Sequence, residues 1–241
     1  MQDPRQQLAW KRRSTKAARY VGVAVAAIGA VGLLGWWANT AAFRTVLAGL
    51  AQMKPNTAVG LVLCGLGLAL GTRGTVARRV RLALGAAAFL IGLVTLGEHI
   101  LGLELGVDGL LASDGVPGPR RMTPGAATAL VLGGFGIGCT ALPHSSERAG
   151  WRVVVETGAS LLVALIGTLA LLGYLYGVQS LYRTEVFSSM ALHTAASFAL
   201  LGLGLSLCRP EQGLAKLVGS SGAGGGGGAG RWGSLSCWCR C

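Results

Sequence analysis

Long stretches without a charged residue alternate along this chain with short polar segments. The uncharged stretches cover residues 20–43, 55–72, 82–97, 122–143, 157–182 and 186–208. A helix needs roughly 17–25 apolar residues to cross a bilayer, whose core offers no water to unpaired backbone groups. We therefore predict six transmembrane helices, at about 18–38, 56–72, 81–103, 124–142, 153–177 and 189–208.

Three of the apolar stretches resemble one another. They read MKPNTAVGLVLCGLGLAL from Met53, MTPGAATALVLGGFGIGC from Met122 and MALHTAASFALLGLGLSL from Met190. A glycine aligned in all three copies is followed four positions later by another small residue, which gives the pairs Gly65/Ala69, Gly134/Gly138 and Gly202/Ser206. Small residues at this spacing let two helices approach closely. The pattern therefore predicts helix packing, within the bundle or between the protomers of a homodimer, and indicates no chemistry.

The helix before each methionine stretch also ends in a similar way. The apolar runs close on Leu34-Gly35, Leu96-Gly97 and Leu172-Gly173. Each unit then consists of an outward helix, a loop and a returning helix. Self-similarity at a fixed interval is the signature of a repeat architecture. We expect an all-α integral membrane protein made of three parallel helical-hairpin repeats, at about 18–72, 81–142 and 153–208.

The distribution of charge sets the expected orientation. The net charge is +12, although only 12% of the residues are charged. Sixteen of the 21 Lys and Arg residues lie before the first helix, in the second-to-third and fourth-to-fifth connections, or after the last helix. Basic residues near helix ends are retained on the cytoplasmic side, so both termini are expected in the cytoplasm. The charge thus encodes topology in a lipid bilayer and gives no support to a nucleic-acid partner.

The composition divides the chain into three parts. Residues 1–17 form a basic cytoplasmic lead-in, 18–208 the six-helix membrane domain, and 209–241 a glycine-rich tail that we expect to be disordered and cytoplasmic. The tail ends in alternating Cys237, Cys239 and Cys241 but lacks the second ligand pair of a structural zinc site. No metal or other cofactor is expected.

Glu98, His99 and His193 are the ionisable residues that stand out within the apolar stretches. An ionisable residue inside a membrane is a functional hypothesis by default. Glu98 lies 17 residues after Arg81, roughly 25 Å along a helix and near the outer edge of the bilayer core. Two interpretations stay open: interfacial anchoring, or a role in sensing a ligand or protons with His193 as a partner.

The third repeat and its lead-in carry a resemblance to a known family. The segment ALLGYLYGVQSLYRTEVFSSMALHTAASFALLGLGLSLCRPEQGL resembles the N-terminal multi-span membrane region of bacterial PAS-containing sensor histidine kinases, including hybrids, and of related diguanylate cyclases. MKPNTAVGLVLCGLGLAL and LIGLVTLGEHILGLELGVDGLL look like earlier parts of that region, and the resemblance covers about residues 15–222. It implies a sensory or anchoring module in the bacterial inner membrane that signals to a cytoplasmic kinase or response regulator.

The chain departs from this family where signalling domains are expected. It ends in RWGSLSCWCRC, and no phosphoacceptor histidine or ATP-binding motif is found, so we expect no catalytic residue and no enzyme activity. We interpret the end as a truncation or a frameshift near Gly224–Gly228, which the DNA beyond the stop codon would test. The alternative is a small multi-pass transporter or channel-like protein, which would need polar groups along a path through the bilayer midplane.

Overall fold

The computed structural model describes residues 4–40, 44–45, 51–71, 74–102, 121–142, 149–176 and 190–208. These ranges contain helices and no strand, which confirms the all-α class. The helices are α1 (Pro4–Trp37), α3 (Pro55–Ala69), α4 (Thr75–Leu101), α6 (Pro124–Ala141), α7 (Ala149–Tyr176) and α9 (Leu192–Cys208). The predicted tail, 209–241, lies outside the described residues.

Four of these helices are long and apolar enough to cross a membrane: α1, α4, α6 and α7. The other two, α3 and α9, have 15 and 17 residues. At 1.5 Å per residue they extend roughly 22–26 Å, less than the ~30 Å hydrocarbon core. The six predicted spans therefore correspond to four helices of spanning length and two shorter apolar helices.

Helix ends follow from local chemistry. Pro55 and Pro124 stand in the first turns of α3 and α6, where the missing N–H of proline would be unpaired in any case. Gly102 ends α4 in the left-handed conformation, with φ 64°, and its N–H donates to the carbonyl of Glu98. At the other end of the chain, α1 begins at Pro4, so the basic lead-in is continuous with the first helix.

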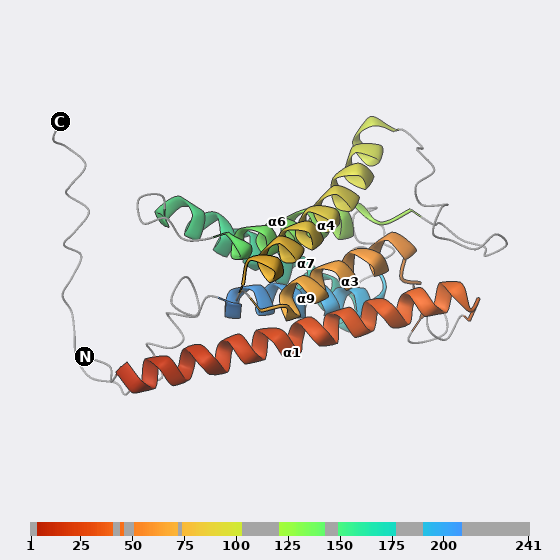
Figure 1. Ribbon diagram of the computed structural model, residues 1–241. Helices are drawn as coiled ribbons and strands as arrows, with labels where there is room; N and C mark the ends of the chain where they lie inside the picture. The colour runs from red at the N-terminus through yellow and green to blue at the C-terminus, as the bar shows by residue number, and fades with distance from the viewer. Residues whose placement is uncertain are drawn as a thin grey trace.

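The helices pack in three pairs, α1 with α3, α4 with α6 and α7 with α9 (Figure 1). The shorter members, α3, α6 and α9, also contact one another and form the centre of the bundle. Each peripheral helix touches the central helix of another pair as well: α1 touches α9, α4 touches α3, and α7 touches α6. The end of α9 lies at the same end of the bundle as the start of α1.

The three peripheral helices bury the same stripe of positions. The buried positions are 18, 22, 25, 29, 32 and 35 in α1, 81, 85, 88, 92, 95 and 98 in α4, and 156, 160, 163, 167, 170 and 173 in α7. Steps of three and four residues place these side chains on one helix face. The other face is apolar and exposed, for example at Leu90 and Leu165, as expected of a surface that meets lipid.

Each helix pair closes through the same backbone contact. The aligned glycine of the central helix lies against two backbone positions of its peripheral partner: Gly65 against Gly22 and Ala26, Gly134 against Gly85 and Phe89, and Gly202 against Ser160 and Ala164. A Cβ atom on Gly134 would lie 2.5 Å from the nitrogen of Phe89 and 2.6 Å from the oxygen of Gly85. Only glycine allows this approach.

The second small residue of each predicted pair has a different role in each copy. The backbone of Ala69 lies against Gly22, and a Cβ on Gly138 would have no neighbour within 4 Å. Ser206 donates a hydrogen bond to Ser160 Oγ at 3.1 Å. The close approach therefore depends chiefly on the first residue of each pair.

The centre of the bundle closes as a ring. A glycine of each central helix faces a large apolar residue of another central helix: Gly67 faces Ile137, Gly136 faces Leu205, and Gly204 faces Leu68. One turn towards the N-termini of these helices, Leu61, Leu130 and Phe198 are fully buried. The bundle is therefore packed with apolar side chains along its middle.

Candidate functional site

The methionine that opens each central helix is held by the same kind of contact. Its backbone carbonyl accepts a hydrogen bond from a side chain in the last turn of the preceding peripheral helix. The donors are Trp36 Nε1 to Met53 (2.7 Å), His99 Nε2 to Met122 (2.7 Å) and Tyr174 OH to Met190 (2.5 Å). We call these contacts the methionine clasps, and the end of the bundle that they occupy the clasp end.

The clasps define a common register for the peripheral helices. The donors lie 14 residues after the crossing positions 22, 85 and 160. In this register the residue before the donor is Gly35, Glu98 or Gly173. The alignment of Gly97 with Gly35 and Gly173, expected from the sequence, is thus one residue out. In the second pair, Glu98 and His99 stand where the other two pairs have Gly-Trp and Gly-Tyr.

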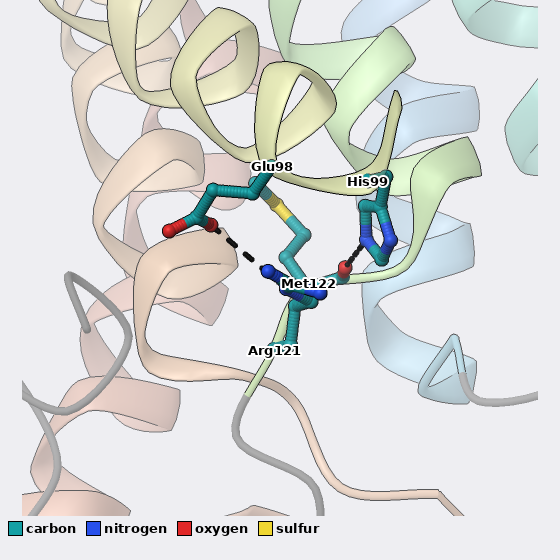
Figure 2. Close-up of polar contacts among 4 residues, drawn as sticks. All are labelled: Glu98, His99, Arg121 and Met122. Atoms are coloured by element: carbon teal, nitrogen blue, oxygen red, sulfur yellow. Dashed lines mark hydrogen bonds and ion pairs between the residues drawn. The ribbon is translucent and has the colours of Figure 1, made fainter. Parts of the chain in front are cut away.

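The clasp of the second pair is combined with an ion pair. Glu98 is buried, with 2% of its side chain exposed, and its Oε2 lies 3.9 Å from Arg121 Nε. Arg121 precedes Met122, so the ion pair and the clasp hold the same short segment. Figure 2 shows the side chains of Glu98 and His99 on either side of this segment. A buried carboxylate needs such a partner, because the loss of hydration strongly disfavours an isolated charge.

The protonation of His99 follows from its acceptor. A backbone carbonyl can only accept, so Nε2 of His99 must carry a hydrogen. Trp36 and Tyr174 provide an N–H and an O–H at the equivalent positions. All three clasps are therefore chemically equivalent as hydrogen bonds, while only that of His99 contains a group that titrates near neutral pH.

His193 lies in a different part of the clasp end. It is the second residue of α9, and its main-chain oxygen accepts a hydrogen bond from Ser197 Oγ at 2.7 Å. Both ring nitrogens are buried and have no hydrogen-bond partner among the described residues. The structure therefore joins Glu98 and His99 to Arg121 and Met122, and no hydrogen bond links the His193 ring to them.

A second polar contact at the opposite end was not expected from the sequence. Arg81, 2% exposed, donates from Nη1 to the carbonyl of Leu70 at 3.2 Å and from Nη2 to Cys208 Sγ at 3.5 Å. It thereby ties the start of α4 to the ends of α3 and α9. A positive charge at helix C-termini is favourable because the macrodipole is negative there. In the sequence Arg81 counted only towards topology.

The described residues contain no group of three or more His, Cys, Asp or Glu side chains that could hold a metal ion. Comparison with family models, with curated proteins and with solved structures finds no match to this chain.

Proposed function

We propose that this chain is a membrane-embedded sensory and anchoring module of a two-component signalling system, of the sensor histidine kinase type. The resemblance of its third hairpin to the membrane regions of such kinases supports this role. Four apolar helices of spanning length support residence in a membrane. In this proposal the membrane is the bacterial inner membrane, the chain crosses it six times, and both termini lie in the cytoplasm.

The recurrence of contacts supports three hairpin repeats. The crossing glycines, the buried stripes and the methionine clasps each occur three times at equivalent positions. The two shorter helices, α3 and α9, complete their passes inside the bundle, where protein surrounds the connecting segments. Non-helical backbone is tolerated at membrane depth where protein buries it.

The observation that carries the sensory role is the Glu98–His99 pair. Among three equivalent clasps, only the second contains ionisable groups, and it adds an ion pair with Arg121. Glycine and an aromatic donor serve the same structural purpose in the other two hairpins. The ionisable residues are therefore not required to build the fold, and we assign them to detection of protons or of a small ion.

Transport is less well supported. A transporter or channel needs polar groups that line a path through the midplane. The centre of the bundle is instead filled by Leu61, Leu130 and Phe198, all fully buried. We therefore propose no catalysis and no transport, and we expect the partners to be the bilayer and a cytoplasmic kinase or response regulator.

The test replaces the sensory pair by the residues of the other hairpins. Residues 1–208 are joined to the cytoplasmic part of a histidine kinase with a transcriptional reporter, and reporter output is measured across external pH and salt. Glu98→Gly with His99→Tyr should abolish the response while the amount of protein in the membrane is unchanged. The reverse exchange at a clasp without ionisable groups, Tyr174→His, serves as the control and should leave the response intact. A response that survives the double substitution would overturn the assignment.

A further inference from the structure

Arg44 is a buried cation between α1 and α3. Only 5% of its surface is exposed, and its guanidinium carbon lies 5.1 Å from the ring centroid of Trp36. Stacking on an indole ring favours a cation but accepts none of its hydrogen bonds. Its Nε and Nη1 atoms are buried and have no hydrogen-bond partner among the described residues. Such a group normally faces an anion, because burial of an uncompensated charge is costly.

The backbone fixes Arg44 next to the start of α3. Its carbonyl accepts a hydrogen bond from the amide of Met53 at 3.0 Å, and Trp36, on which it stacks, donates to the carbonyl of the same methionine. The guanidinium and the first residues of α3 are therefore held on the two sides of one short contact. The first methionine clasp thus positions a buried arginine at a helix N-terminus.

The N-terminus of α3 is itself unusual. Its N-cap residue is Lys54, which is 7% exposed and makes no side-chain capping hydrogen bond. Lysine has no acceptor for the amides of the first turn, and its charge lies at the positive end of the helix dipole. In α6 the N-cap is Thr123, whose hydroxyl accepts from the amide of Ala126 at 3.2 Å. The two helices thus begin with opposite capping chemistry.

We propose that Arg44, Lys54 and the first turn of α3 bind a phosphate oxyanion. Arginine, lysine and the amides of a helix N-terminus are the donors that recognise phosphate in proteins. The oxyanion would accept from the guanidinium, and its charge would compensate both cations and the helix dipole. Free phosphate and the phosphodiester of a lipid headgroup share this chemistry. The site does not depend on the sensory role of Glu98 and His99, and it can exist whether or not that role is correct.

The first experiment measures thermal unfolding of the full chain in a nonionic detergent. Inorganic phosphate is titrated at constant ionic strength, with chloride as the balancing anion. The unfolding temperature should rise with phosphate, by about 5 °C when phosphate is at 100 times its dissociation constant. Arg44→Gln should remove this rise. Arg121→Gln, which alters an arginine at the same end of the bundle that is paired with Glu98, should keep it.

A second variant covers the case in which Arg44→Gln does not fold. Arg44→Lys keeps the charge but loses the planar donors, so it should bind phosphate more weakly and respond only at higher concentration. A rise of equal size in the wild type and in both Arg44 variants would overturn the proposal. An equal response to acetate and phosphate would overturn the assignment to phosphate.

The second experiment separates the two sources of phosphate. The protein is purified from membranes, and retained phospholipid is counted by native mass spectrometry. If the ligand is a lipid headgroup, the wild type should retain phospholipid that Arg44→Gln loses, and added inorganic phosphate should displace it. If the ligand is free phosphate, retained lipid should be equal in the two proteins and only the thermal response should differ. Equal lipid retention together with no thermal response would refute the site.

Discussion

At the scale of single residues, the methionine clasps show that one structural task is performed by three different side chains. Trp36, His99 and Tyr174 have no common chemical class beyond a hydrogen-bond donor on a ring. Self-similarity in the sequence finds the methionines, because they are identical. It does not find the donors, whose shared feature is a distance of 14 residues from a small crossing residue. The acceptor is a backbone atom, which leaves no trace in the sequence.

The contribution of the second clasp can be measured at His99. In His99→Leu the buried carbonyl of Met122 loses its donor, which should lower the free energy of unfolding by about 1–3 kcal/mol. His99→Tyr, the residue found at the equivalent place in the third hairpin, should restore most of that stability. Chemical unfolding in mixed micelles measures both. Equal losses for Leu and Tyr would show that packing of the imidazole matters more than its hydrogen bond.

At the scale of helices, the sequence predicted the crossing points well because glycine has a direct physical meaning there. Gly65, Gly134 and Gly202 lie against the backbone of a partner helix, where a Cβ would collide. The partner positions on α1, α4 and α7 were harder to predict, because the third is Ser160 where the others are glycine. Spacings of three and four residues would have revealed them, had the burial of the stripe been known.

Two glycines of α6, four residues apart, provide a matched test of this packing. Gly134→Ala places a methyl group against the backbone of α4 and should destabilise the protein by about 1–3 kcal/mol, the usual cost of overpacking. Gly138→Ala meets nothing within 4 Å and should be neutral or slightly stabilising. The unfolding temperatures of the two variants decide the matter, and equal effects would contradict the crossing contact.

The contact of Arg81 predicts a change in the reactivity of a native cysteine. Arg81→Met removes the hydrogen bonds to Leu70 and Cys208, so the end of α9 should loosen and Cys208 should react faster with a maleimide. Arg79→Ala, a change at an exposed position two residues earlier, should leave the rate as in the wild type. The rates are compared in a background in which the other cysteines are serine or alanine. An unchanged rate in Arg81→Met would show that α9 does not depend on this contact.

At the scale of the whole molecule, the all-α class followed from charge-free stretches, and four helices have spanning length. The shortness of α3 and α9 could not be foreseen, because apolar residues continue beyond the last helical turn of α3 and before the first of α9. Nor could the closed ring of central helices, since Gly67, Gly136 and Gly204 face residues of other hairpins. Contacts between distant segments carry no local sequence pattern.

The proposed topology predicts where reporters become active. An alkaline phosphatase joined after Gly102 should be active, because this point follows an outward helix. The same reporter joined after Gly74 should be inactive, and a fluorescent protein that matures only in the cytoplasm should show the opposite pattern. Activity after Gly74 would reverse the orientation and place the Glu98–His99 pair on the cytoplasmic side.

The use of a main-chain oxygen as the clasp acceptor has a consequence for how such a protein can evolve. A duplicated hairpin inherits the acceptor whatever its own side chains become, so the donor position can exchange Trp, Tyr and His by single steps without loss of the fold. The same applies to the preceding position, where glycine and glutamate both occur. A copy freed from structural duty at these two positions could acquire new chemistry while its sisters maintained the scaffold, and the middle hairpin has the composition of such a copy.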